Sequence, residues 1–360
     1  MSTFLDDMLT ATSTVIRPLV ISRAATSAIL GNGSLLIETA LADVVAMRAV
    51  RLNGETVINF AAYETPGSTA LQTQSLHLGN GVFSESYSVP SGQLTVDTLA
   101  LRQHSPCALQ TLSLPSGSYA HAPIVPSSVI VDGADHVSVH SNGTPVPCMR
   151  VRGHDRQSGV RMTYLGAYLT ASGVTFTGLD TRATDAANRF TVTSSGTLAV
   201  MHMVAVGPDS DMQATRYVTA ALQTSQTATA LRAAHTMRWS SLWRAGVQVL
   251  PRQPTADPDV AEVNVVLRAA QYRALSVRRD TGRLAQTLTG PSWYRSSSLV
   301  TALLATVPDA AKGAAHDSLR DALADCVTDG NFTNPAAPKL EDLASSMLCL
   351  LYTSPSPRDS

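Results

Sequence analysis

The sequence predicts a mainly β fold followed by α-helices: a large antiparallel β-sandwich, a long linking helix and the start of a helical domain. Between residues 28 and 208, short runs of alternating apolar and polar residues are separated by Gly, Ser, Asn and Pro. From Asp209 the apolar residues adopt helical spacing, with almost no helix-breaking residue up to Gly246. After a Pro-rich stretch at 251–258, helical spacing returns and continues to Leu348.

These changes of pattern divide the 360 residues into five expected parts. A chain of this length suits two domains, each with its own apolar core. The expected parts are an N-terminal extension at 1–27, the sandwich at 28–208, a linker helix and exit strand at 209–250, a truncated helical domain at 251–348 and a tail at 349–360.

The expected strands share a period of two residues, and turns containing Gly or Asn separate them. They cover 28–38, 44–52, 56–60, 74–87, 94–101, 107–114, 125–139, 160–169, 173–178, 190–192 and 198–206. Asn53-Gly54 and Asn80-Gly81 are tight-turn signals within this series, so the strands beside them should form hairpins. Many short strands at this spacing are typical of an antiparallel sandwich.

The linker helix is marked by His235, Trp239 and Trp243, which are spaced four residues apart and therefore lie on one helical face. Stripes with this spacing are most often buried, so we expect both tryptophans to belong to the core. The Asp-Ser-Asp cluster at 209–211 supplies candidate N-caps for a single long helix. A short extended run at 247–250 should follow the helix.

The region after the Pro-rich stretch is expected to be helical. Apolar residues with helical spacing, bounded by Asp, Gly or Pro, predict four further helices at 259–277, 297–307, 309–327 and 340–348. The third tryptophan lies in a predicted turn at 289–295. Successive helices with short connections indicate the beginning of a larger helical domain.

Composition excludes several functional classes. The net charge is −1 and no basic block is present, so nucleic acid is not an expected partner. No apolar run reaches the length of a membrane span, and the N-terminus has no basic segment before an apolar core. We therefore expect a cytoplasmic protein without a membrane partner. The four cysteines are widely spaced and form no CxxC pair, which argues against a disulfide framework.

Neither a metal nor a cofactor is expected. His136 and His140 share one strand face, and His154 lies in a predicted polar loop, but no third ligand follows at the spacing of a metal site. These histidines are interpreted as hydrogen-bonded or solvated. The sequence contains no GxGxxG, GxxxxGK(S/T) or GxSxG motif, so it lacks the usual phosphate-binding loops and the nucleophile turn of serine hydrolases.

The tail at 349–360, CLLYTSPSPRDS, resembles the translation of an adapter used in sequencing libraries. We therefore expect it to be foreign to the protein. Pro355 and Pro357 also prevent the preceding helix from continuing into it. On this interpretation the natural chain continues beyond Leu348.

Four segments together resemble a known family. They are LHLGNGVF at 76–83, the His-x3-Trp-x3-Trp pattern of the linker helix, LTGPSWYR at 288–295 and VPDAAKGAAHDSLRDALADC at 307–326. In this order they resemble the N-terminal half of the family 65 glycoside hydrolases and phosphorylases. Within the family they resemble the branch that contains acid trehalase and glucosyl-galactosyl-hydroxylysine glucosidase more than the maltose phosphorylases. The resemblance covers residues 28 to about 338 and rests on order and spacing, because no single motif is decisive.

The resemblance implies a super-sandwich, a helical linker and an (α/α)6 barrel that acts on α-glucosides with inversion. In that family a glutamate is the general acid, and water or phosphate is the nucleophile. By this precedent the glutamate lies beyond Leu348, so no catalytic residue can be named in this chain. A carbohydrate is the expected substrate, and Trp293, Tyr294 and Arg295 are the candidate substrate-binding residues. The alternative interpretation is that these three residues form a packed turn.

The sequence departs from the family directly after Arg295. The family there has Phe-Trp-Asp-x-Glu, whose aromatic and acidic groups hold the sugar, whereas this chain continues with three serines at 296–298. The stretch at 331–338 also lacks the family's tryptophan. Two function classes therefore stay open. The chain is either the N-terminal half of an inverting α-glucosidase or phosphorylase, or a non-catalytic carbohydrate-binding or structural relative without the sugar-pocket motif.

Overall fold

The described residues form an antiparallel β network followed by two helices. The computed structural model describes residues 15–16, 29–32, 35–40, 45–51, 57–64, 70–103, 106–123, 129–181, 186–245 and 272. Thirteen strands within these ranges join one hydrogen-bonded network, and every strand pair in it is antiparallel. The predicted mainly β fold is confirmed for this part of the chain.

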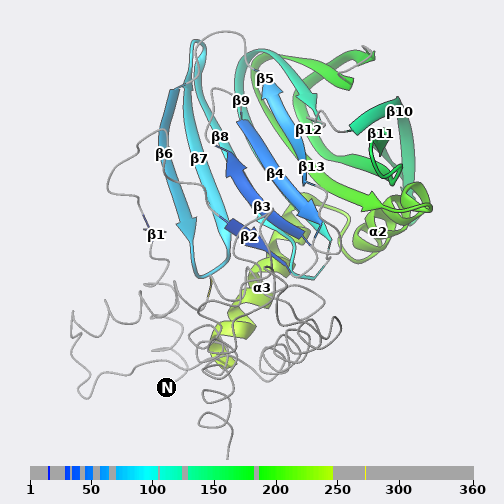
Figure 1. Cartoon of the computed structure of the whole chain (residues 1–360). Helices are drawn as coiled ribbons and strands as arrows, with labels where there is room; N and C mark the ends of the chain where they lie inside the picture. Colours follow the sequence, from blue (N-terminus) through cyan, green and yellow to red (C-terminus); the bar gives the residue numbers. More distant parts are fainter. Residues whose placement is uncertain are drawn as a thin grey trace, which may run out of the picture.

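The strands form two layers (Figure 1). The first layer is a long sheet with the spatial order β1 (Val15–Ile16), β6 (Ala70–His77), β7 (Val82–Val89), β8 (Gly92–Ala100), β9 (Cys107–Ala122), β13 (Ala186–Val206), β12 (Arg161–Thr181), β11 (Thr144–Asp155) and β10 (Val129–Ser141). The second layer contains β2 (Ile29–Gly31), β3 (Leu35–Ala40), β4 (Val45–Arg51) and β5 (Val57–Glu64). The layers are joined where β5 pairs with the end of β9, at Ala62 opposite Ala122.

The alternation of β13 shows how the core is built. Leu198, Val200 and Val204 point into the core between the two layers, where they join Leu30, Leu35 and Ile37 of β2 and β3. The intervening side chains point to the opposite face of the long sheet and pack against the helices; they are Ala199, Met201, Met203 and Ala205. Each fully buried Val, Leu or Met contributes about 1.5–3 kcal/mol. This part of the long sheet is therefore buried on both faces.

The expected single linker helix consists of two helices. α2 (Ser210–Thr224) and α3 (Ala228–Ala245) are separated by a break in which Ser225 adopts an extended conformation. The hydroxyl of Thr227 accepts a 3.1 Å hydrogen bond from the backbone N–H of Ala230, so this threonine caps α3. The prediction of one helix was wrong because Ser and Thr end a helix through their side chains without a Gly or Pro signal. Neither helix in the described region has the length and hydrophobicity needed to cross a bilayer.

Strand β11 was not predicted from the sequence. It forms a hairpin with β10 around Asn142 and Gly143, which both adopt positive φ angles as a tight Asn-Gly turn requires. Pro145 and Pro147 made this segment look unlike a strand. Both prolines pair with β10, but β12 begins its pairing with β11 only at Cys148. Among the described strands, the prolines therefore have β10 as a neighbour on one side and no strand on the other. Because no described strand lies on that other side, the missing N–H groups of the prolines leave no hydrogen bonds unmade there.

Strands β12 and β13 are longer than the short runs that the sequence predicts. Each has 21 residues, and the pairing between them shifts register at three places. Gly173 and Gly178 lie beside two of these shifts and have φ angles of +68° and +136°. Each bulge moves the alternation by one position, so a continuous strand looks interrupted in the sequence.

Several sequence predictions lie outside the described residues. They concern the exit strand at 247–250, the turn at 289–295, the adapter-like tail at 349–360 and the four helices at 259–277, 297–307, 309–327 and 340–348, of which only Tyr272 is described, as helical. Within the expected N-terminal extension, β1 is described and pairs with β6. The remaining predictions for these segments stay predictions.

Glu85 generates a prediction about stability and pH. It lies on the inner face of β7, is 5% exposed, and accepts hydrogen bonds from Gln74 Nε2 at 3.0 Å and Tyr87 OH at 2.9 Å. Burial raises the pKa of its carboxyl from 4.5 to about 7, although both hydrogen bonds act in the opposite direction. The folded state therefore keeps this proton at a pH where the unfolded state has released it. Stability from this group falls between pH 4.5 and about 7 and then levels off.

We predict that Glu85→Gln removes this loss, because an amide oxygen keeps both hydrogen bonds without a charge. At pH 8 the variant should be more stable than the unmodified protein by roughly 1–3 kcal/mol, as measured by urea unfolding. At pH 5 the free energies of unfolding of the two proteins should differ by less than at pH 8. A stability difference that is the same at both pH values would contradict this account.

Candidate functional site

The described residues place two groups of polar and aromatic side chains close together. The first, the core network, lies inside the sandwich and consists of His121, Tyr164, Tyr168, Asn188 and His202. The second, the joint cluster, lies where the hairpin turns of the sandwich meet α3; its members are Leu78, Gly79, Gly81, Arg102, His235, Trp239, Trp243 and Tyr272. Each group is a candidate for function.

The core network is a continuous chain of hydrogen bonds. The Tyr164 hydroxyl lies 2.9 Å from His121 Nε2 and 2.9 Å from His202 Nδ1. His121 Nδ1 lies 2.8 Å from the Tyr168 hydroxyl, which also accepts a 2.8 Å hydrogen bond from the Asn188 amide. Both histidines are completely buried. Burial lowers the pKa of His121 to about 3 and lowers the pKa of His202 well below 6.5, so both rings are neutral.

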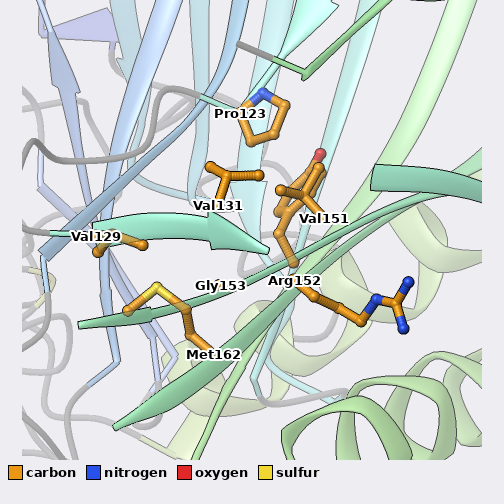
Figure 2. A pocket seen from close by; sticks show the side chains of 8 residues that line it. Pro123, Val129, Val131, Val151, Arg152, Gly153 and Met162 are labelled. Carbon is orange, nitrogen blue, oxygen red and sulfur yellow. The ribbon is translucent and has the colours of Figure 1, made fainter. Parts of the chain in front are cut away.

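The cavity that the structure describes beside the core network is small. The cavity beside Tyr164 has a volume of about 10 Å³, which is close to the space that one water molecule needs. Apolar side chains, including Val129, Val131 and Met162, surround it, and the charged end of Arg152 points away (Figure 2). Pockets for small molecules are far larger. The core network therefore provides hydrogen-bond partners for buried polar groups, and the cavity beside it is too small for a sugar.

The joint cluster confirms the expected buried stripe on the linker. Trp239 and Trp243 are 1% and 2% exposed, and their rings stack with centroids 5.2 Å apart. The Trp243 Nε1–H donates to the carbonyls of Leu78 and Gly79 at 3.0 and 3.1 Å. These bonds fix α3 to the turn between β6 and β7.

Arg102 and His235 complete the joint cluster. The guanidinium carbon of Arg102 lies 4.5 Å from the centroid of the Trp239 ring, which is the distance of a cation–π interaction. The Arg102 backbone N–H donates to His235 Nδ1 at 3.3 Å. Burial is the main cause that lowers the pKa of His235 to about 4, so this ring also stays neutral and can accept that bond.

Two further contacts hold the hairpin turns in place near α3. The Asn32 amide donates to the carbonyls of Leu101 and Cys107 at 3.1 Å each, which ties the turn after β2 to the turn between β8 and β9. Arg232 of α3 forms an ion pair with Asp97 of β8. Sequence reasoning missed both anchors. The Gly-Asn-Gly sequence at 31–33 is typical of a turn, but no signal indicated the partners of Asn32.

The predicted site residues Trp293, Tyr294 and Arg295 lie outside the described residues. Nor does the structure bring histidines into a metal site within the ranges that it describes. His136 and His140 are exposed on one face of β10, as the interpretation of solvated histidines expects.

His154 was expected in a polar loop, but it lies near the end of β11, opposite Ile130. Its Nδ1 atom is 2.9 Å from a carboxylate oxygen of Asp132. The loop prediction was wrong because the sequence did not reveal the β10–β11 hairpin. The cysteines that the structure describes, Cys107 and Cys148, are buried and free of disulfides.

No family profile and no curated protein matches the sequence. The fold is similar to that of a structure named as a kojibiose phosphorylase from the human microbiome, with a TM-score of 0.57 and 7% sequence identity. The match covers 83% of this chain and 47% of that chain, so this chain spans about half the length of the phosphorylase. A second similar structure is a family 92 glycosyl hydrolase, with a TM-score of 0.46, 13% identity and coverage of 87% and 49%. The match at a TM-score of 0.57 shows that this chain shares its fold with about half of the first structure.

The core network predicts acid sensitivity. The pKa of His121 is about 3 in the folded state and 6.5 without burial, so the unfolded state binds protons first as the pH falls. The stability that the neutral ring provides is complete above pH 6.5 and is lost progressively toward pH 3. We predict a loss of up to about 1 kcal/mol per pH unit from His121 in this range, and a further loss in the same direction from His202, measured by urea unfolding at a series of pH values. Constant stability between pH 6 and pH 4 would contradict this prediction.

Tyr164→Phe should destabilise the protein at neutral pH. The variant removes a hydroxyl that contacts both His121 and His202, and each ring loses a buried hydrogen-bond partner. We expect a loss of roughly 1–3 kcal/mol in the free energy of unfolding. The control is Tyr217→Phe, since Tyr217 is 39% exposed on α2. Equal effects of the two variants would show that the network does not stabilise the fold.

Proposed function

We propose that this chain is the N-terminal half of an inverting α-glucosidase or glycoside phosphorylase that is similar to family 65 and acts on α-glucosides. The observation that carries the proposal is the fold. The match to the kojibiose phosphorylase structure extends over 83% of this chain at a TM-score of 0.57. The order of the sequence segments that resemble family 65 is a second, independent support.

In the proposed reaction, a carboxylic acid protonates the oxygen of the departing sugar while water or phosphate attacks the anomeric carbon from the opposite side. The configuration at that carbon is inverted because one displacement takes place. We propose that the general acid belongs to the part of the protein after Leu348, and that Trp293, Tyr294 and Arg295 contribute to sugar binding. The sandwich and the joint cluster would then support the catalytic domain and take no part in proton transfer.

A non-catalytic carbohydrate-binding or structural relative is the second candidate. It is favoured by the sequence after Arg295, where three serines at 296–298 stand in place of the family's aromatic and acidic block. An aromatic platform and carboxylates provide most of the grip on a sugar, so their loss would weaken the pocket. Recovery of the complete gene separates the two candidates at the level of sequence, through the presence or absence of a downstream glutamate.

Activity of the complete gene product tests the proposal. We expect it to cleave an α-linked glucose disaccharide and to release the β-anomer first, as NMR would record before the anomers equilibrate. Dependence on phosphate would identify phosphorolysis, and its absence would identify hydrolysis. The 360-residue chain alone should show no turnover. Release of the α-anomer would disprove inversion, and inactivity of the complete product on kojibiose, trehalose and maltose would favour the non-catalytic relative.

Substitutions at the proposed pocket give a further test in the complete gene product. Trp293→Ala should reduce kcat/KM for the disaccharide by about ten-fold or more, since the loss of an aromatic contact to a bound sugar is worth on the order of 1–3 kcal/mol. Tyr217→Ala on the exposed face of α2 is the control and should leave kcat/KM unchanged. An unchanged kcat/KM in Trp293→Ala would assign Trp293 to a packed turn.

A further inference from the structure

We propose that the joint cluster is the docking site for the chain's own segment 259–277, and that Tyr272 is the anchor of this segment. Trp239 then couples the folding of the segment to a hairpin turn of the sandwich. The proposal concerns contacts within the chain and does not depend on sugar chemistry. It would hold for a catalytic and for a non-catalytic protein alike.

The position of Tyr272 is the first step of the argument. Tyr272 is helical, is 3% exposed, and belongs to the same apolar core as Trp239 and Trp243. Its ring stacks on Trp239 with centroids 5.0 Å apart and an angle of 26° between the planes. Trp239 and Trp243 stack with the same angle of 26°, so three aromatic rings pack together. An aromatic ring buried in this way is a strong anchor, because it removes a large apolar area from water.

The second step concerns the space around Trp239. Gly81, in the turn between β6 and β7, has a φ angle of +63°, and a Cβ atom at this position would overlap Nε1 and Cε2 of Trp239. Trp239 Nε1 is buried and has no hydrogen-bond partner among the described residues, so close packing and not a hydrogen bond positions this edge of the ring. Arg102, in the turn between β8 and β9, lies over the same ring. Two hairpin turns of the sandwich therefore determine where Tyr272 can stack.

A consequence is that Gly81 and Tyr272 should be energetically coupled although they are distant in sequence. A side chain at position 81 has to displace Trp239, and a displaced Trp239 no longer offers its ring to Tyr272. Loss of Tyr272 removes the same contact from the other side. The free-energy effects of two substitutions that disrupt the same contact do not add, whereas the effects of substitutions at independent sites do.

Limited proteolysis with trypsin on the full chain tests the coupling, because Arg268 and Arg273 lie beside the anchor in sequence. Gly81→Ala and Tyr272→Ala should each increase the rate of cleavage after these arginines by about ten-fold or more, as mass spectrometry of the fragments would show. The double variant should be cleaved no faster than the faster single variant. Cleavage at Arg152, within the sandwich, should stay at the rate of the unmodified chain.

Two matched controls separate docking from local strain. Gly143→Ala introduces the same kind of backbone strain, since Gly143 has a φ angle of +82°, but a Cβ atom there meets nothing within 4 Å. Tyr217→Ala removes an exposed tyrosine from α2. Both controls should leave the cleavage rates after Arg268 and Arg273 unchanged. The proposal would be overturned if Gly81→Ala were cleaved at the same rate as Gly143→Ala, or Tyr272→Ala at the same rate as Tyr217→Ala. It would also be overturned if the increase in cleavage rate in the double variant were the product of the increases in the two single variants.

Tyr272→Phe covers the case in which a test variant fails to fold. It keeps the ring and should therefore restore the slow cleavage of the unmodified chain. Rapid cleavage in Tyr272→Phe, with a normal circular dichroism spectrum of the sandwich, would also overturn the proposal, because ring stacking would then not hold the segment. All these measurements are independent of enzymatic activity. A failure of docking can thus be distinguished from a failure of the proposed function.

Discussion

The burial of the long sheet on both faces is the constraint on which the rest of the structure depends. Leu198 and Val200 point into the sandwich, while Met201 and Met203 point toward α2. A shift of β13 by one residue would exchange these two sets, so the packing on both faces fixes its register. The fixed register of the sheet in turn determines where its hairpin turns end. One of these turns places Gly81 against Trp239, and another places Arg102 over the same ring.

Much of the fold could be predicted because its signals are local. Asn80-Gly81 marks the hairpin of β6 and β7, since Asn and Gly are favoured in the turns that reverse a strand, and Gly81 has a φ angle of +63° there. The features that could not be predicted depend on which strand or side chain a residue contacts in the folded chain. Pro145 and Pro147 look like strand breakers until it is known that this first part of β11 pairs with β10 and not with β12. The break between α2 and α3 depends on the hydroxyl of Thr227, whose capping bond has no unique sequence signature.

In the candidate sites, the contacts between residues distant in sequence were even harder to predict. The spacing of Trp239 and Trp243 was enough to predict a buried stripe, because a helix repeats every 3.6 residues. Their partners Arg102 and Tyr272 come from distant parts of the chain, and no periodic pattern connects them. For the core network, the only signal is a polar residue within an apolar run, as in Met201-His202-Met203. Its hydrogen bonds follow from the pairing of β13 with both β9 and β12, which the sequence does not specify.

The end of the long sheet at β10 has a further consequence for the behaviour of the protein in solution. Among the described strands, β10 pairs with β11 alone, so its other edge carries backbone groups that could recruit a strand from another molecule. Its outward side chains include His136 and His140, and the neighbouring strand carries Pro145 and Pro147 at the same end. Polar side chains and prolines at a sheet edge hinder the addition of a foreign strand. His136 and His140 therefore make this edge of β10 a poor template for a strand from another molecule.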